Sequence, residues 1–235
     1  MKEANPIYLD YNATTPIAKE VADVMAPYLY SFFGNPSSSH GFGVKARMAV
    51  EKARQQVAEA INCQPNEIIF TSGGTESNNT AIRGYAIANR KKGQHIITSQ
   101  IEHPAVLEVC RYLETQGFSV TYLPVDRFGM VDPQDLERAI RHDTLLVSIM
   151  HANNEVGTIQ PISELTEITH RHGAVFHTDA AQTLGKYPLD IQELGVDMLS
   201  IAGHKLYAPK GIGALFIRNG TVLEKLMYGA DHESN

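Results

Sequence analysis

Seven short apolar runs, separated by helix-like segments, constrain the fold of this chain more than any other feature. They span residues 67–71, 95–99, 119–124, 145–150, 174–179, 197–202 and 213–218. Each run is apolar along nearly its whole length, which is typical of strands that are covered on both faces. Because helix-like segments separate most of the runs, we expect right-handed crossovers and a mostly parallel sheet.

The segments between and before these runs carry helix signals. Asp132 followed by Pro133 predicts the start of a helix, with Asp132 as the N-cap and Pro133 as the first helical residue. Helices are predicted over residues 18–29, 43–61, 105–116, 133–141 and 161–172. In the second of these, four apolar side chains are expected on one side: Val44, Met48, Val57 and Ile61.

The last two runs differ from the others. The chain between Gly203 and Gly211 is too short for a crossover helix, so these strands should be antiparallel. The predicted fold class is therefore α/β, with three α/β/α layers and a mostly parallel seven-stranded sheet that contains one antiparallel strand.

Charge and cysteine content exclude several classes of protein. Lys and Arg number 20 against 26 Asp and Glu, and the net charge of −6 offers no general attraction to nucleic acid or to anionic membranes. Cys63 and Cys110 form no pairing motif, so a disulfide scaffold and a CxxC site are excluded. No secretory signal is visible in residues 1–10, and no segment approaches the ~18 apolar residues that span a bilayer. A reduced, cytoplasmic protein is expected.

Several candidate site residues follow the ends of the predicted strands. The glycine turn in residues 71–77 leaves a strand and opens a helix, so Gly74 and Thr75 could bind an anion through free N–H groups. An ordinary helix cap explains this turn equally well. Asp179 ends a buried strand, where a carboxylate needs a cationic partner, although it could instead cap a following helix.

Lys205 follows a nearly continuous apolar strand. Desolvation would lower its pKa and free its amine to attack carbonyl groups, although most lysines at strand ends are solvated. His103 and Asn154 also follow strands directly. No histidine pair has metal-ligand spacing, and we expect no metal. Five strand ends thus direct an anion site, an aromatic base, an amide, a carboxylate and a lysine to one edge, which would suit a phosphorylated pyridine aldehyde.

The chain resembles the cysteine desulfurases, which are class V aminotransferases of the fold-type-I pyridoxal-phosphate enzymes. The resemblance runs from about Ile7 to the end of the chain and is carried by residues 8–16, 34–38, 71–78, 103, 153–155, 177–182 and 203–205. It implies pyridoxal 5′-phosphate as the cofactor, L-cysteine as the substrate, an iron–sulfur scaffold as a sulfur acceptor, and a homodimer.

The resemblance also implies a role for each matching residue. Lys205 and His103 would be the catalytic residues: Lys205 would carry the cofactor as a Schiff base and shuttle protons, and His103 would stack on the ring and assist proton transfer. Asp179 would pair with the ring nitrogen. The other cofactor-binding positions are Asn154 and Gln182, near the ring, and Gly74, Thr75 and His204, at the phosphate. Ala202 stands where close relatives often have serine, and one lost hydroxyl contact costs about 1 kcal/mol.

The family's domain plan implies that residues 1–15 pack with a C-terminal small domain and that residues 16–235 form the cofactor-binding large domain. We expect the small domain, with its persulfide-forming cysteine, to be absent from these 235 residues, since Cys63 and Cys110 do not match that cysteine. We therefore expect cofactor binding with little or no sulfur transfer. The alternatives are a selenocysteine lyase, another class V enzyme of the aminotransferase type, or a non-catalytic module that binds the cofactor and dimerises.

Overall fold

A seven-stranded sheet forms the centre of the molecule in the computed structural model, which describes residues 6–230 and 233. The strands are β1 (Ile68–Thr71), β2 (His95–Ser99), β3 (Ser119–Leu123), β4 (Thr144–Ser148), β5 (Val175–Asp179), β6 (Met198–Ala202) and β7 (Gly213–Ile217). All seven predicted strands are present, with ends that shift by at most two residues. Residues 1–5 of the predicted N-terminal segment lie outside the described residues, as do residues 231–232 and 234–235 of the predicted large domain.

The strand order is β1-β7-β6-β5-β4-β2-β3. β7 pairs antiparallel with both of its neighbours, and all other pairs are parallel. The prediction of a single reversed strand is therefore confirmed. Because the other six strands point the same way, their carboxyl ends meet at one edge of the sheet, which is where open α/β sheets bind ligands.

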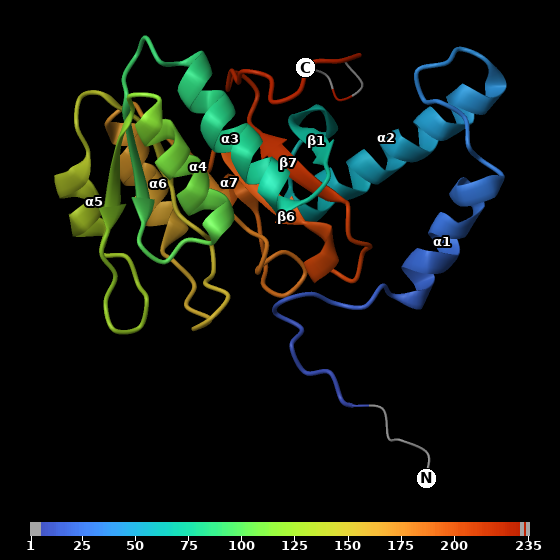
Figure 1. The fold of residues 1–235 in the computed structure, drawn as a ribbon, viewed down its shortest axis with the longest axis horizontal. Helices are drawn as coiled ribbons and strands as arrows, with labels where there is room; N and C mark the ends of the chain where they lie inside the picture. Colours follow the sequence, from blue (N-terminus) through green and yellow to red (C-terminus); the bar gives the residue numbers. More distant parts are fainter. Residues whose placement is uncertain (1–5, 231–232, 234–235) are drawn as a thin grey trace.

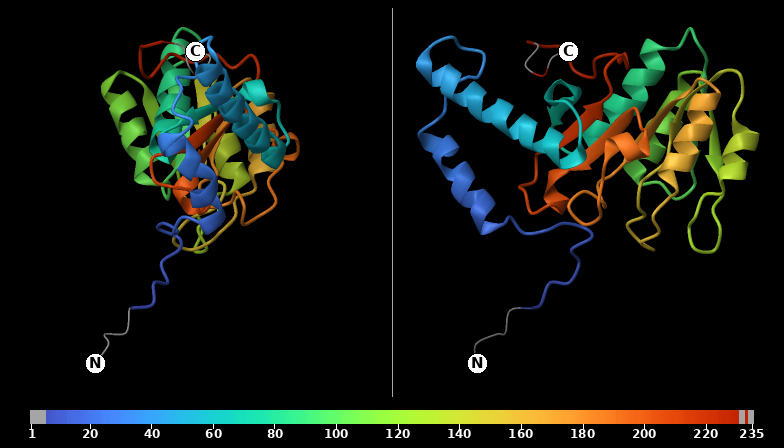
Figure 2. Two further views of the ribbon diagram at one scale, coloured as in Figure 1. Left: turned by 90° about the vertical axis from the view of Figure 1, so that its right-hand side faces the viewer. Right: turned by 180° about the vertical axis from the view of Figure 1, so that it is seen from behind.

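Helices cover both faces of the sheet and complete the three predicted layers. They are α1 (Lys19–Tyr30), α2 (Gly41–Ile61), α3 (Gly74–Ala88), α4 (Pro104–Thr115), α5 (Pro133–Ala139), α6 (Ile162–Arg171) and α7 (Ile191–Leu194), with 3-10 turns η1 (Pro65–Glu67) and η2 (Gly203–Lys205). Figure 1 shows α3 and α4 in front of the sheet. The view from behind in Figure 2 shows α6 and the inner end of α2 on the opposite face.

Two apolar clusters fill the spaces between these layers. One joins α3 and α4 to the sheet through Ile82, Val106 and Leu113. The other includes residues of α5 and α6 and the end of α2, such as Leu136, Leu165 and Ile61. Burial on both faces explains why the central strands are apolar along nearly their whole length.

Two expectations about burial were wrong. β3 lies at an edge of the sheet and is covered less completely than expected, because Ser119 is exposed and only Leu123 is fully buried, although its residues contact both apolar clusters. In α2, Met48 is 69% exposed although it was expected on the apolar side with Ile61. The reason is visible in Figure 1, because the first half of α2 extends away from the sheet.

Across residues 6–230 and 233, every helix is too short or too polar to cross a lipid bilayer.

Candidate functional site

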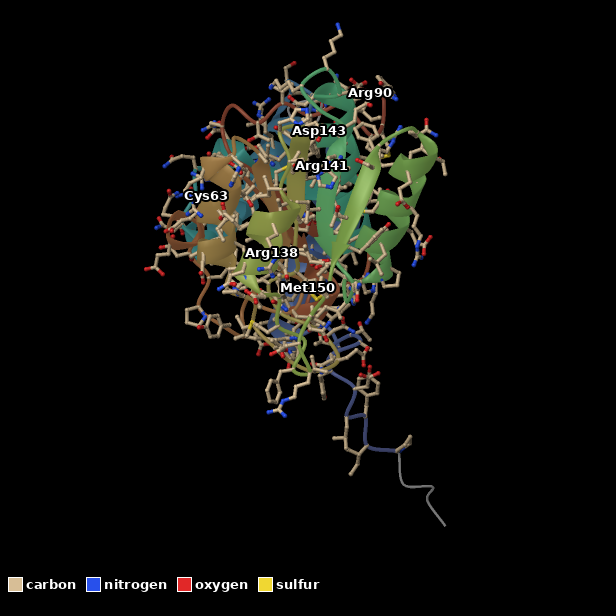
Figure 3. All side chains as sticks on the ribbon, turned by 90° about the vertical axis from the view of Figure 1, so that its left-hand side faces the viewer. Cys63, Arg90, Arg138, Arg141, Asp143 and Met150 are labelled. Atoms are coloured by element: carbon tan, nitrogen blue, oxygen red, sulfur yellow. The ribbon has the colours of Figure 1, made fainter. Side chains whose placement is uncertain are left out.

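A cavity of about 730 Å³ opens where the carboxyl ends of the parallel strands meet. All nine candidate residues line it: Gly74, Thr75, His103, Asn154, Asp179, Gln182, Ala202, His204 and Lys205. Met150, another lining residue, marks this end of the sheet in Figure 3, opposite Arg141 and Asp143, which precede β4. Parallel strand direction therefore brings together side chains that are distant in the sequence.

The glycine turn forms one wall of the cavity. α3 begins at Gly74, and the preceding Gly73 has a φ of 153°, a value that side-chain-bearing residues rarely adopt. The Ser72 N–H, just before the helix, donates to the Glu76 carboxylate at 2.7 Å. The first N–H groups of the helix itself have no acceptor within the helix and are available to a ligand. The N-terminus of a 15-residue helix thus faces a cavity, an arrangement that favours an anion.

Asp179 supplies a buried carboxylate to the same cavity. It is 7% exposed, and its oxygens accept hydrogen bonds from Asn78 Nδ2 at 2.7 Å and from the Ala181 N–H at 2.9 Å. Within the described part of the chain, this carboxylate forms no salt bridge. Turns follow it, so the alternative that it caps a helix was wrong.

Lys205 ends η2, directly after β6, and is half-buried on the cavity wall. Burial lowers the pKa of its amine, the charge of Asp179 opposes that shift, and the charge of Lys186 adds to it. Among residues 6–230 and 233, the Lys205 amine has no hydrogen-bond partner or ion pair. A half-buried amine of this kind differs from the solvated surface lysine that was the alternative.

The turn that carries Lys205 is held by the N-terminal segment. The His204 carbonyl accepts from both the N–H and the hydroxyl of Thr15, each at 2.9 Å. The Thr15 hydroxyl also accepts from the Tyr207 N–H at 2.9 Å, and His204 Nδ1 lies 3.1 Å from the Thr14 hydroxyl. Sequence reasoning gave Thr15 no role, since its only signal was its place in the Tyr8–Pro16 motif.

The remaining polar candidates are held by local hydrogen bonds. His103 caps α4, and its Nδ1 accepts from the Ala105 N–H at 3.1 Å, so the neutral ring carries its proton on Nε2. Asn154 donates to Glu155 at 2.7 Å. Gln182 donates to the Asn12 carbonyl at 3.1 Å, which links the cavity wall to the N-terminal segment.

The cysteines and the buried histidines lie elsewhere. Cys110 is buried between α4 and the sheet, and Cys63 is partly buried against the other cluster. Burial raises the pKa of each thiol to about 12. His177 is enclosed by the hydroxyls of Ser148 and Ser200. In the ranges 6–230 and 233, no cluster of three or more histidine, cysteine or carboxylate side chains could hold a metal ion.

Comparison with known proteins gives matches over nearly the whole chain. Residues 7–234 match the family Aminotransferase class-V. The chain is 59% identical over 229 residues to "Cysteine desulfurase IscS" of Dictyoglomus turgidum, a match that covers 97% of this chain and 58% of the relative. The chain therefore spans about 58% of the length of that curated relative.

Two solved structures are similar to this chain in both fold and sequence. A structure titled "NIFS-LIKE PROTEIN" superposes with a TM-score of 0.94 at 44% identity, covering 97% of this chain and 63% of that one. Another, titled "SspA in complex with cysteine", has a TM-score of 0.93 at 45% identity, covering 96% and 66% of the two chains. At this identity the likeness extends beyond the fold to the sequence.

Proposed function

The chain belongs to the aminotransferase class V family, and from that premise we propose that its cavity binds pyridoxal 5′-phosphate in a cysteine desulfurase. One observation carries the proposal: a single cavity is lined by a helix N-terminus, by the Asp179 carboxylate and by the half-buried Lys205 amine, and within residues 6–230 and 233 neither of these two side chains has an ion pair. Members of this family depend on pyridoxal phosphate. The named relatives support cysteine as the substrate.

The residues present fit this cofactor. Its phosphate needs N–H donors, its ring nitrogen needs an anionic partner, and its aldehyde needs an amine. The start of α3 at Gly74, the carboxylate of Asp179 and the amine of Lys205 match these needs in turn. When bound, pyridoxal phosphate supplies an aldehyde for condensation with amines and a ring that accepts the electron pair released at the substrate Cα.

The protein's own groups would orient the cofactor and move protons. Asp179 would hold a proton on the ring nitrogen, because a buried carboxylate favours a cationic neighbour. Lys205 would take the proton from the substrate Cα, since burial lowers the pKa of its amine and so increases the unprotonated fraction that can accept a proton. Gly74, Thr75, His204 and the backbone at Ala202 would bind the phosphate. His103 would stack on the ring, with Asn154 and Gln182 at its edge.

The thiol that receives sulfur would have to come from outside the described residues. Cys63 and Cys110 pack in or against the core, and neither lines the cavity. Burial also keeps both thiols protonated, and a protonated thiol is a poor nucleophile. We therefore propose that these 235 residues bind the cofactor but transfer little or no sulfur by themselves.

We also propose that an iron–sulfur scaffold or another protein accepts the sulfur, that the protein is a homodimer, and that it is located in the cytoplasm. The two free cysteines support a reducing compartment. We further propose that residues 1–15 form an N-terminal segment and residues 16–235 the large domain, with the hydrogen bonds of Thr15 joining the end of that segment to the turn of Lys205.

Borohydride reduction followed by peptide mass spectrometry tests the proposal directly. Protein incubated with pyridoxal phosphate should carry a phosphopyridoxyl group on Lys205, together with a visible absorption band that reduction abolishes. Lys205→Ala should lose both signals. The matched control is Lys92→Ala, at the exposed turn after α3, which should keep both. Labelling spread over surface lysines, or a band that persists in Lys205→Ala, would contradict the proposed site.

A further inference from the structure

Glu102 is a deeply buried carboxyl group that the proposed chemistry does not use. It directly precedes His103 and is 4% exposed. Its Oε1 accepts from the Ser99 hydroxyl at 2.6 Å and from the Met150 N–H at 2.9 Å, and its Oε2 lies 3.1 Å from the same N–H. Ser99 ends β2 and Met150 follows β4, so this side chain bridges the carboxyl ends of two adjacent strands.

A second connection runs parallel to this bridge. Asn153 Nδ2 donates to the Ile101 carbonyl at 3.2 Å. The Asn153 Oδ1 accepts from the N–H groups of Glu155 and Val156, at 2.8 and 3.0 Å, which closes the turn around Asn154. The turn that carries His103 is thus tied at two points to the turn that carries Asn154.

These ties bear on the cavity although Glu102 does not line it. His103, Met150 and Asn154 all line the cavity, and each lies in one of the two connected turns. Because Glu102 joins these turns from within the protein, the separation of the two walls depends on its length and on its hydrogen bonds.

Both protonation states of Glu102 can maintain the bridge. Burial raises the pKa of its carboxyl to about 8, the hydrogen bonds from Ser99 and Met150 oppose the shift, and the charge of Asp179 adds to it. The neutral acid still has an acceptor oxygen for Met150 and a proton for the Ser99 hydroxyl. The titratable groups that face it are Asp179, at the end of β5, and Cys110, in α4.

We propose that Glu102 is a positioning residue that ties the turn of His103 to the turn after β4 and so sets the width of the cavity at its cofactor-stacking wall. The identity of the bound ring rests on the proposed function, whereas the tie itself does not. A neutral isostere should preserve the tie, and truncation should release it.

The tie can be observed in the cofactor-free protein by NMR. Protein labelled with 15N at its 7 methionines has few amide signals, and Met150→Leu identifies that of Met150. In the wild type this signal should move with pH, with a midpoint near 8. In Glu102→Gln it should not titrate, and the control Glu167→Gln, at an exposed position of α6, should behave like the wild type. Identical titration in the wild type and in Glu102→Gln would overturn the tie.

Cofactor affinity tests the consequence for the cavity. Glu102→Ala should weaken pyridoxal-phosphate binding about tenfold, because it leaves the Met150 N–H without its partner. Glu102→Gln should restore the affinity to within about threefold of the wild type, since an amide oxygen can accept the same bond. Wild-type affinity in Glu102→Ala, or equal losses in both variants, would overturn the positioning role.

Two further variants protect the test against misfolding of Glu102→Ala. Ser99→Ala removes the hydrogen bond that orients Glu102, and Asn153→Ala removes the second tie. Weaker binding in both would support the proposal, whereas unchanged binding in both would overturn it. If the wild type failed to bind pyridoxal phosphate, the proposed function would fall, and the Met150 signal would still decide whether the tie exists.

Discussion

The fold holds the Asp179 carboxylate in place and still leaves its charge available to a ligand. Two hydrogen bonds, from Asn78 and from the Ala181 N–H, fix its carboxylate without neutralising its charge. Burying an unpaired charge is costly, and a cationic ring nitrogen would recover part of that cost. The residue is therefore expected to contribute more to cofactor binding than to the stability of the cofactor-free protein.

Asp179→Asn separates these two contributions, because the amide keeps the shape and loses the charge. Loss of a charged hydrogen bond of about 1.5–3 kcal/mol should weaken pyridoxal-phosphate binding about 10- to 100-fold. The urea midpoint of the cofactor-free protein should change little. Absorbance titration and urea unfolding measure the two effects. The control is Asp135→Asn, the same substitution on the surface of α5, and equal affinity in both variants would contradict the prediction.

At the scale of the elements, a polar row joins the central strands within an otherwise apolar sheet. His177 of β5 lies 2.8 Å from the Ser148 hydroxyl of β4 and 3.0 Å from the Ser200 hydroxyl of β6. Burial lowers the pKa of His177 to about 3, so the ring is neutral in the folded protein over the ordinary pH range. Each ring nitrogen can then pair with one hydroxyl, one as donor and one as acceptor.

This row makes the fold sensitive to acid. Because the folded-state pKa of His177 lies below its ordinary value of 6.5, its contribution to stability is complete above pH 6.5 and is lost as the pH falls toward 3. His95 and His151 act in the same direction, because burial lowers the pKa of each to about 4. The free energy of unfolding should therefore decrease below pH 6.5, by up to about 1.4 kcal/mol per pH unit for each histidine.

Urea unfolding at several pH values checks this prediction. His177→Gln removes one titrating group. Between roughly pH 6 and pH 5, the variant should take up about one proton fewer on unfolding than the wild type, so its free energy of unfolding should depend on pH less steeply. The exposed His142→Gln serves as the control and should retain the wild-type slope. Equal slopes in all three proteins would show that His177 is not held neutral in the fold.

The 3-10 turn that carries Lys205 depends on another element, the N-terminal segment. The buried Thr15 hydroxyl donates to the carbonyl of His204, one residue before Lys205, and accepts from the N–H of Tyr207, two residues after it. Thr15→Val keeps the volume and removes both bonds, which should lower the free energy of unfolding by about 1–3 kcal/mol. It should also weaken cofactor binding by displacing the amine.

Thermal unfolding and cofactor titration of Thr15→Val test this role, with Thr15→Ser as the rescue because it restores the hydroxyl. If valine and serine variants bind the cofactor equally well, the segment does not position Lys205.

At the scale of the whole molecule, α1 and the first half of α2 extend from the body that the sheet forms (Figure 2). None of the 12 residues of α1 is buried, and Leu29 and Val24 are 77% and 70% exposed. A short helix gains most of its stability from packing, so a helix without buried residues is expected to pack against another surface. A second copy of the chain is the expected partner, in keeping with the proposed homodimer.

Analytical ultracentrifugation tests this expectation. The wild type should sediment as a dimer at micromolar concentration. Leu29→Glu should shift it toward the monomer with a change in monomer stability of about 0.5 kcal/mol or less, since the side chain is exposed in the single chain. Val222→Glu, at an exposed position near the C-terminal end, is the control. A wild type that remains monomeric would contradict the expected homodimer.

Local sequence determined the elements of this fold. The seven apolar runs became seven strands, because a strand that is buried on both faces must be apolar along its length. The short connection after Gly203 determined the antiparallel pairing of β6 and β7. The placement of candidate residues directly after strands predicted a shared cavity, since parallel strands end at the same edge.

Tertiary structure alone decided which side chains support that cavity. Asn78 reaches Asp179 across 101 residues, Glu102 reaches Met150 across 48, and Thr15 reaches His204 across 189. Periodicity and capping signals state which face of an element is apolar and where it ends, and they contain nothing about its neighbours. These hydrogen bonds, the exposed edge of β3 and the projection of α1 depend on how several elements pack together, so no local pattern could predict them.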